Sequence, residues 1–165
     1  MMNVVRAALD ANKGLVMVKK ALRRLTDYQH ASVLADNIAW IRANCRDFAL
    51  YATKTDSNLW TQALAYSETL EARADEVLSA AGVGLGGGSF YPMLYFLACH
   101  RKPGVILETR VAAGYSSQVL LKALDLNGEG ALFSSDFPYF RLANPEKYIG
   151  ILVEERLKTR WHLYT

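Results

Sequence analysis

The C-terminal half of the chain alternates short apolar runs with helical patterns, and this alternation restricts the fold more than any other feature. The short apolar run at residues 105–107 is typical of a buried strand, and residues 131–135 are predicted to form a second strand. A helical pattern from Ser116 to Leu126 lies between them. A third strand is predicted to begin at Trp161. Strands and helices in this order, with short connections, are typical of a parallel sheet with right-handed crossovers. We therefore expect an α/β fold in this half.

The segment between the second and third strands is predicted to be helical as well. Asn144 is a candidate N-cap, and Pro145 follows at the first helical position, where its missing N–H costs nothing. This start signal predicts a helix that runs to about Lys158. The expected order of elements is β–α–β–α–β.

Three helical patterns precede the strands. Apolar residues recur at spacings of three and four over residues 15–25, 34–52 and 59–81. Ser57 and Asn58 come just before the third pattern and are candidate N-caps for its helix. The N-terminal half is therefore expected to consist of helices.

A glycine-rich stretch separates the two halves. Residues 82–88 contain five glycines, a density that the interior of a helix or a strand tolerates poorly. Ser89 is then expected to cap a short helix over residues 90–100. We therefore predict a helical N-terminal region, residues 1–81, and a second region that holds the sheet, residues 82–165. A plain linker is the simplest interpretation of the glycines.

Composition and charge exclude several classes of protein. The 165-residue chain is 52% hydrophobic and 21% charged, which excludes global disorder. Its net charge of +3 comes from the N-terminus, because residues 1–25 hold six Lys and Arg against one acid. The remainder is near neutral, so no nucleic-acid footprint is expected over the whole chain. A solvated helix face is the simplest interpretation of the basic cluster. The alternatives are contact of residues 13–25 with a membrane surface and contact of the cluster with nucleic acid.

The cysteines and histidines predict neither a disulfide framework nor a metal site. Cys45 and Cys99 lack the spacing of a metal site or a redox motif, and we expect two buried thiols. This cysteine usage fits a reducing compartment, so we predict a cytoplasmic protein. The three histidines are isolated, so no metal ligands are assigned. The longest apolar run, Tyr91 to Cys99, is too short to span a bilayer.

The candidate site lies where the first strand becomes the next helix. Glu108 is near the strand end, Gly114 lies in the turn, and Asp136 ends the second strand, 22 residues after Gly114. A turn of this kind exposes backbone N–H groups, and an acid after the next strand binds ribose hydroxyls in nucleotide-binding α/β folds. These positions predict an adenosine-type ligand. The dinucleotide fingerprint G-x-G-x-x-G is absent, which ranks NAD last among the candidate ligands.

The residues of this turn resemble the first motif of class I S-adenosylmethionine (SAM)-dependent methyltransferases, E/D-x-G-x-x-x-G. The motif stands here as Glu108-Thr-Arg-Val-Ala-Ala-Gly114. Residues 105–117 and 132–139 are similar to a bacterial subgroup of these enzymes that reads VETGVAAGYSS and, further on, LYSSDFPYF. The resemblance covers about residues 82–165, half of the chain.

The resemblance implies a methyltransferase that uses SAM and an acceptor that the sequence does not name. By position, the methionine end of SAM would lie against Glu108 and Gly114, with the ribose at Asp136 and the adenine on Phe137. The glycine stretch would then form a loop over the methionine end. The cofactor-binding residues implied are Glu108, Ala112, Gly114, Tyr115, Ser116, Ser117, Asp136 and Phe137.

Two departures from the family pattern support an alternative. Arg110 replaces the first glycine of the motif, which adds a cation beside a site for a sulfonium; it could pair with Glu108 or with the SAM carboxylate. The chain also supplies only strands 1 to 3 of the family's seven-stranded sheet, order 3-2-1-4-5-7-6. The strand at residues 105–107 would then be an edge, which either the N-terminal helices or a second subunit, in a homodimer, would cover. The alternative function is a truncated or degenerate homologue that acts as a binding or interaction module.

Overall fold

The computed structural model describes most of the chain and divides it into two compact units. Described are residues 15, 16, 18–20, 22–24, 31–45, 47–137, 139 and 141–165. One unit comprises Met1–Asp47 and Tyr139–Asn144, and the other comprises Phe48–Pro138 and Pro145–Thr165. The assignment of residues 1–81 and 82–165 to separate regions stays a prediction. The candidate site residues 108–137 all belong to the second unit.

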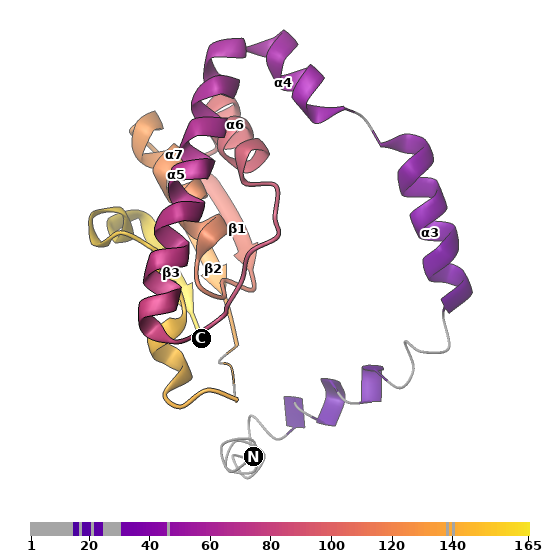
Figure 1. The fold of residues 1–165 in the computed structure, drawn as a ribbon, viewed down its shortest axis with the longest axis vertical. Coiled ribbons are helices and arrows are strands. Elements are labelled where there is room, and N and C mark those ends of the chain that lie inside the picture. Colours follow the sequence, from indigo (N-terminus) through magenta and orange to yellow (C-terminus); the bar gives the residue numbers. More distant parts are fainter. Residues whose placement is uncertain are drawn as a thin grey trace. The chain divides into compact units, whose positions relative to one another are not determined.

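The pattern over residues 34–52 forms two helices, so the prediction of one continuous stripe is wrong. Helix α3 (Ala31–Asn44) belongs to the first unit, whereas α4 (Phe48–Thr55) belongs to the second (Figure 1). The side-chain amide of Asn44 donates to the carbonyl of Trp40 at 2.8 Å and so satisfies one carbonyl of the last turn of α3. The pattern over residues 15–25 lies partly outside the described residues, and those described there are helical.

Helix α5 (Ser57–Ala81) confirms the third helical pattern but starts differently from the prediction. Its N-cap is Asp56, not Ser57 or Asn58. Asp56 has an extended backbone, and its carboxylate accepts a hydrogen bond from the N–H of Leu59 at 2.9 Å. An aspartate one residue earlier therefore does the capping that the sequence assigned to its neighbours.

Helix α6 (Tyr91–Arg101) confirms the short helix that follows the glycine stretch, with Pro92 in its first turn. The predicted cap by Ser89 is wrong, because Phe90 occupies the N-cap position and no side chain caps the helix. The helix ends at Lys102, which is left-handed with φ +46°. The sheet begins three residues later.

The sheet has three parallel strands in the order β1-β2-β3, which confirms an α/β fold. The strands are β1 (Val105–Thr109), β2 (Ala131–Ser135) and β3 (Trp161–Tyr164). Helix α7 (Tyr115–Asn127) connects β1 to β2, and Gly128 ends it in the left-handed region. β1 is two residues longer than predicted and therefore includes Glu108 within the strand.

The helix predicted from Pro145 to Lys158 is wrong. Two short 3₁₀ helices, η2 (Pro145–Tyr148) and η3 (Glu155–Arg160), stand in its place. Between them, two backbone N–H groups donate to the loop after β1, while those of Ile151 and Val153 donate three residues back. The N–H of Gly150 donates to the carbonyl of Ala112 at 2.9 Å, and the N–H of Leu152 donates to that of Ala113 at 3.0 Å. Tertiary hydrogen bonds therefore replace the helical ones that the cap signal predicted.

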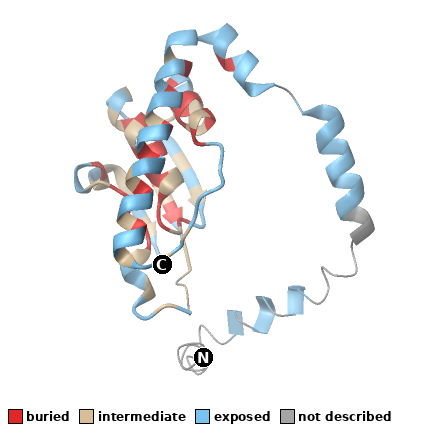
Figure 2. Ribbon diagram, in the orientation of Figure 1, coloured by how far each residue is buried: buried red, intermediate tan, exposed pale blue. Residues whose placement is uncertain are grey.

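The helices of the second unit bury one face of the sheet. Helix α7 packs against β2, and α6 packs against both α5 and α7. Ile106 of β1 and Leu132 of β2 are paired in register, so their side chains lie on the same face of the sheet. Both belong to the core on the side of these helices. Figure 2 shows the buried residues concentrated in α5, α6, α7 and the adjoining sheet. The largest side chains with almost no exposure are Phe96, Leu121, Leu124, Leu132, Leu152 and Leu157.

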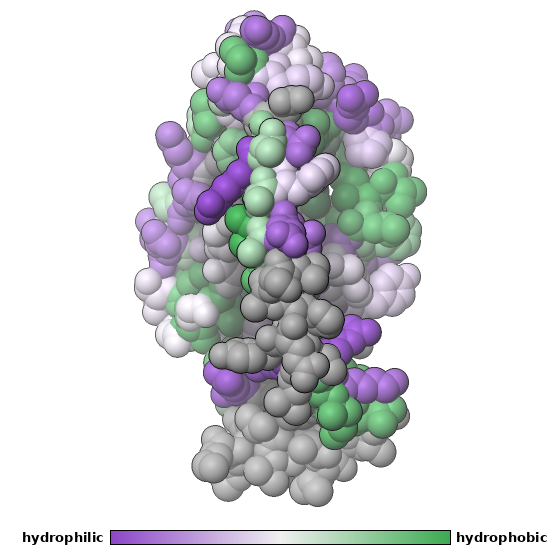
Figure 3. Space-filling model, turned by 90° about the vertical axis from the view of Figure 1, so that its right-hand side faces the viewer, coloured by the Kyte–Doolittle hydropathy of each residue, from purple (hydrophilic) through white to green (hydrophobic). Residues whose placement is uncertain are grey.

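The outer face of β1 is exposed, and within the described residues β1 is an edge strand. Val105 is 61% exposed and Leu107 80% exposed, and Phe133 of β2 stacks on His162 of β3 on the same face. Figure 3 shows one face of the molecule, where hydrophobic residues reach the surface in several places between hydrophilic ones. Cover of the β1 edge by the N-terminal helices or by a second subunit stays a prediction. Within the described residues, no helix is both long and apolar enough to cross a membrane.

Candidate functional site

The loop between β1 and α7 has a left-handed backbone at three of its five residues. The φ angles are +66° at Arg110, +52° at Ala112 and +93° at Gly114. Residues with a Cβ rarely adopt this region, where their side chain approaches the following carbonyl. The loop therefore keeps a shape that suits glycine although two of these three positions carry other residues.

Asp136 fixes this loop from the end of β2. Its Oδ2 accepts a hydrogen bond from the N–H of Ala112 at 2.7 Å, and its Oδ1 accepts one from the N–H of Phe137 at 2.7 Å. The N–H of Arg110 donates to the carbonyl of Ser135 at 2.8 Å, which continues the pairing of β1 with β2 by one residue. The loop is thus held by the last residue of β2, Ser135, and by the residue that follows it, Asp136.

Glu108 joins the two strands to the start of α7. Its carboxylate accepts hydrogen bonds from the hydroxyls of Ser116 at 2.5 Å, Ser117 at 2.7 Å and Ser134 at 2.7 Å. Ser117 and Ser134 are buried, so their hydroxyls need a partner inside the protein, and Glu108 supplies it. Glu108, the acid that the motif assigns to the ligand, therefore also accepts hydrogen bonds from within the protein.

Gly114 meets a packing requirement. A Cβ on Gly114 would lie 2.8 Å from the Cα of Gly150 and 3.1 Å from Cγ2 of Val153. The segment between η2 and η3 can approach the loop this closely only because residue 114 has no side chain. From the sequence, we expected a ligand to approach this glycine closely. In the structure, the backbone of Gly150 approaches it instead.

A buried amide holds that segment in place. Gln118 of α7 is fully buried; its Nε2 donates to the hydroxyl of Tyr66 and to Oε1 of Glu154, both at 2.8 Å. Its Oε1 accepts from the N–H of Glu154 at 2.9 Å. Arg73 of α5 pairs with Glu154 at 2.9 Å and also donates to the carbonyl of Leu152. Burial raises the pKa of Tyr66 above its ordinary value.

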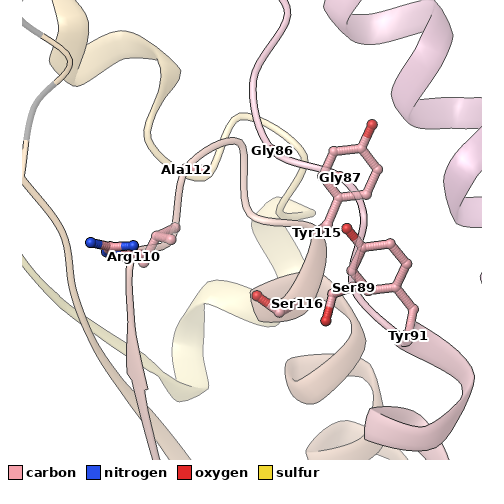
Figure 4. A pocket seen from close by; sticks show the side chains of 9 residues that line it. Gly86, Gly87, Ser89, Tyr91, Arg110, Ala112, Tyr115 and Ser116 are labelled. Atoms are coloured by element: carbon pink, nitrogen blue, oxygen red, sulfur yellow. The ribbon is translucent and has the colours of Figure 1, made fainter. Parts of the chain in front are cut away.

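A cavity of about 220 Å³ opens beside the loop, between it and the glycine stretch (Figure 4). Tyr91 stacks on Tyr115 with ring centroids 5.3 Å apart, and a Cβ on Gly86 would lie 3.1 Å from the Tyr115 ring. Burial is the main cause that raises the pKa of both tyrosines, so both present neutral hydroxyls. The lining residues are Gly86, Gly87, Ser89, Tyr91, Arg110, Val111, Ala112, Tyr115 and Ser116.

The predicted site residues fall into three groups around this cavity. Ala112, Tyr115 and Ser116 line it. Glu108 lies behind Ser116 and accepts a hydrogen bond from its hydroxyl. Gly114 and Ser117 are packed inside the protein. Asp136 and Phe137 adjoin the loop but are not among the lining residues.

Sequence reasoning missed Ser89 and Tyr91 as lining residues. Tyr91 begins α6 three residues after the last glycine of the stretch, so an aromatic residue at the start of a helix that follows a glycine-rich loop was the available signal. The glycine stretch itself was expected to form a loop near the ligand, and its Gly86 and Gly87 line the cavity.

Neither cysteine belongs to the cavity. Cys99 is buried as expected, and burial raises the pKa of its thiol; the same expectation for Cys45 is wrong, because Cys45 is exposed. Among the described residues, no group of His, Cys, Asp and Glu side chains is arranged to hold a metal ion.

Comparison with protein-family models, with curated proteins and with solved structures gives no match for this chain.

Proposed function

We propose that the chain is a SAM-dependent methyltransferase that transfers a methyl group to an acceptor still to be found. The observation that carries this proposal is the backbone at Arg110, with φ +66°. The motif that the turn resembles has glycine at this position, and glycine adopts a positive φ readily. The loop keeps a conformation that suits glycine although residue 110 is arginine. This supports descent from an ancestral chain with glycine at this position.

The arrangement of the strands supports the same proposal. The order β1-β2-β3, with the loop after β1 beside the acid that ends β2, is the arrangement expected for strands 1 to 3 of a Rossmann-like methyltransferase sheet. Ligands of open parallel sheets bind at the carboxyl ends of the strands. The cavity lies at that end, next to Arg110 and Ala112.

The size of the cavity suits one end of SAM. Sites for small molecules and cofactors have volumes of roughly 300–1,000 Å³, whereas this cavity has about 220 Å³. We assign it to the methionine end, between Ser116, Tyr115 and the glycine stretch. The nucleoside would then extend toward Asp136 and Phe137. Each carboxylate oxygen of Asp136 already accepts a hydrogen bond from one backbone N–H. Each can accept a further hydrogen bond, from a ribose hydroxyl.

The residues of this chain would act by binding and orientation. SAM supplies a methyl group that is already activated by its sulfonium, so positioning provides most of the rate. Ser116 and the tyrosine pair would hold the methionine end and limit access of water to it. No general base is assigned, and the cytoplasm stays our prediction for the compartment, because it depends on the cysteine usage of the sequence.

A non-catalytic binding module is the second candidate function. Three observations favour it: Arg110 adds a positive charge beside the proposed sulfonium site, and the carboxylates of Glu108 and Asp136 already hold protein groups. Such a protein would bind SAM weakly, or it would bind a macromolecule instead of SAM.

Calorimetric titration with SAM and with S-adenosylhomocysteine tests the proposal. We expect binding of at least one of the two and weaker binding of NAD. Ser89→Phe would fill the cavity from an exposed position and should abolish this binding, whereas the control Ser79→Phe, on the exposed face of α5, should not. Absence of binding at millimolar ligand would exclude the enzyme and support the binding module.

A further inference from the structure

Arg110 contributes a charge to the cavity without filling it. It lines the cavity directly after β1, and Figure 4 shows its side chain directed away from the rings of Tyr115 and Tyr91. Arg110 as a whole residue is exposed. A ligand could therefore occupy the space beside the tyrosine pair without a steric conflict with this side chain, and any effect of Arg110 on it is electrostatic.

No ion pair within the described part of the chain neutralises this charge. The ion pairs there join Arg73 and Arg156 to acids and Lys158 to Glu155, and Arg110 has none. The two acids beside the loop, Glu108 and Asp136, accept hydrogen bonds from serine hydroxyls and backbone N–H groups instead. A ligand in the cavity would therefore feel the positive charge of Arg110.

SAM and S-adenosylhomocysteine differ at the sulfur alone. The first carries a methyl group and a positive charge there, whereas the second is a neutral thioether. Their amino-acid ends are the same, so a pairing of Arg110 with the ligand carboxylate would strengthen both equally. The ratio of the two affinities therefore isolates the interaction of Arg110 with the sulfur.

We propose that Arg110 makes the cavity select the neutral thioether form of the ligand over the sulfonium form. This inference rests on the proposed function, because it takes the cavity as the site of the methionine end. Two like charges across a partly solvated site change an affinity by on the order of three- to thirtyfold. The chain would accordingly retain the demethylated product in preference to the methyl donor.

The test compares the dissociation constants of both ligands in four proteins: wild type, Arg110→Lys, Arg110→Gln and Arg110→Gly. We expect the ratio of the SAM constant to the S-adenosylhomocysteine constant to be about three- to thirtyfold higher in wild type than in Arg110→Gln. Arg110→Lys keeps the charge and should retain the wild-type ratio, whereas Arg110→Gly should match Arg110→Gln. Added salt should reduce the difference between wild type and Arg110→Gln, because it screens exposed charges.

Two outcomes would overturn the inference, and they differ in what else they exclude. Binding of both ligands with the same ratio in wild type and Arg110→Gln would contradict the inference alone. Binding of neither ligand to any of the four proteins would exclude the proposed function as well.

Discussion

The carboxylate of Asp136 holds the backbone N–H of Ala112 at 2.7 Å, across the loop that follows β1. Ala112 is left-handed, with φ +52°, a conformation that alanine rarely adopts. The other carboxylate oxygen accepts the N–H of Phe137 at 2.7 Å. Asp136 therefore stabilises the loop that lines the cavity, whether or not a ribose also binds to it.

Replacing this acid should destabilise the second unit in proportion to the hydrogen bonds lost. We expect Asp136→Ala to lower the free energy of unfolding by about 1.5–3 kcal/mol, the contribution of hydrogen bonds to a charged group. Asp136→Asn keeps an oxygen acceptor for Ala112 and should lose about half as much. Urea unfolding followed by circular dichroism measures both values, and an unchanged midpoint for Asp136→Ala would contradict this role.

The close approach of Gly114 to Gly150 predicts a large cost for a single methyl group. Both Gly114→Ala and the control Gly128→Ala place alanine at a positive φ, but a Cβ at Gly128 meets no atom within 4 Å. We expect Gly128→Ala to cost about 1–2 kcal/mol in unfolding free energy. Gly114→Ala should cost about 1–3 kcal/mol more, because its Cβ overlaps the backbone of Gly150. Equal losses in the two variants would show that the contact is not tight.

Arg110→Gly should stabilise the chain. The positive φ of Arg110 costs about 1–2 kcal/mol, which glycine avoids, while the flexibility of glycine in the unfolded state returns about 0.4–1 kcal/mol of this. The expected net gain in unfolding free energy is about 0.5–1 kcal/mol. Arg110→Ala is the matched control, since it removes the charge but keeps the Cβ, and it should give no such gain. A loss of stability in Arg110→Gly would argue against strain at this position.

Stability should fall at high pH because of Tyr95 in α6. Burial raises the pKa of its hydroxyl from 10.0 to about 12. The folded state therefore binds the phenolic proton more tightly than the unfolded state does. The contribution is complete below pH 10 and is lost as the pH rises toward 12. Tyr95→Phe cannot ionise there, so its unfolding free energy should fall less than that of wild type between pH 9.5 and 11.5; parallel curves would contradict the prediction.

The exposed edge strand gives a test of the predicted homodimer. Leu107 of β1 is 80% exposed, so Leu107→Lys should change the unfolding free energy by less than about 0.5 kcal/mol. A lysine at an edge opposes pairing with another strand. If a second copy covers this edge, sedimentation velocity should show a dimer for wild type and a monomer for Leu107→Lys. A wild-type monomer at high concentration would exclude this partner.

The strands and the long helices could be predicted because their signals are local. Val105-Ile106-Leu107 is a short apolar run, Ala131–Ser135 begins with three apolar residues, and the periodic pattern of α5 covers residues 59–81. Asp136 was found for a similar reason, since the end of a strand is a position that the sequence alone defines. The parallel pairing of β1 with β2 then followed from the helix between them, α7. The parallel pairing of β2 with β3 was also predicted, although the connection contains two 3₁₀ helices instead of the expected α-helix.

The errors about the segment after Pro145 and about Gly114 occurred where a distant contact overrides a local signal. Asn144 and Pro145 form a valid helix start, yet Gly150 and Leu152 donate their N–H groups to the loop after β1. The role of Gly114 also depends on Gly150, 36 residues further along the chain, so no motif spacing reveals it. The cavity is lined by residues from two segments, 86–91 and 110–116. Most of α6 and all of β1 separate these segments along the chain. Tertiary packing of this kind has no local sequence signature.

Backbone amide chemical shifts during titration with S-adenosylhomocysteine report whether the cavity beside the loop binds this ligand. If the cavity holds the methionine end and Asp136 lies beside the ribose, the amides of residues 86–89, 110–117 and 136–137 should shift together and saturate with one dissociation constant. The amides at the outer face of β1, residues 105–107, should remain unchanged. No shift in the first three segments at millimolar ligand, or shifts confined to other parts of the chain, would contradict the account.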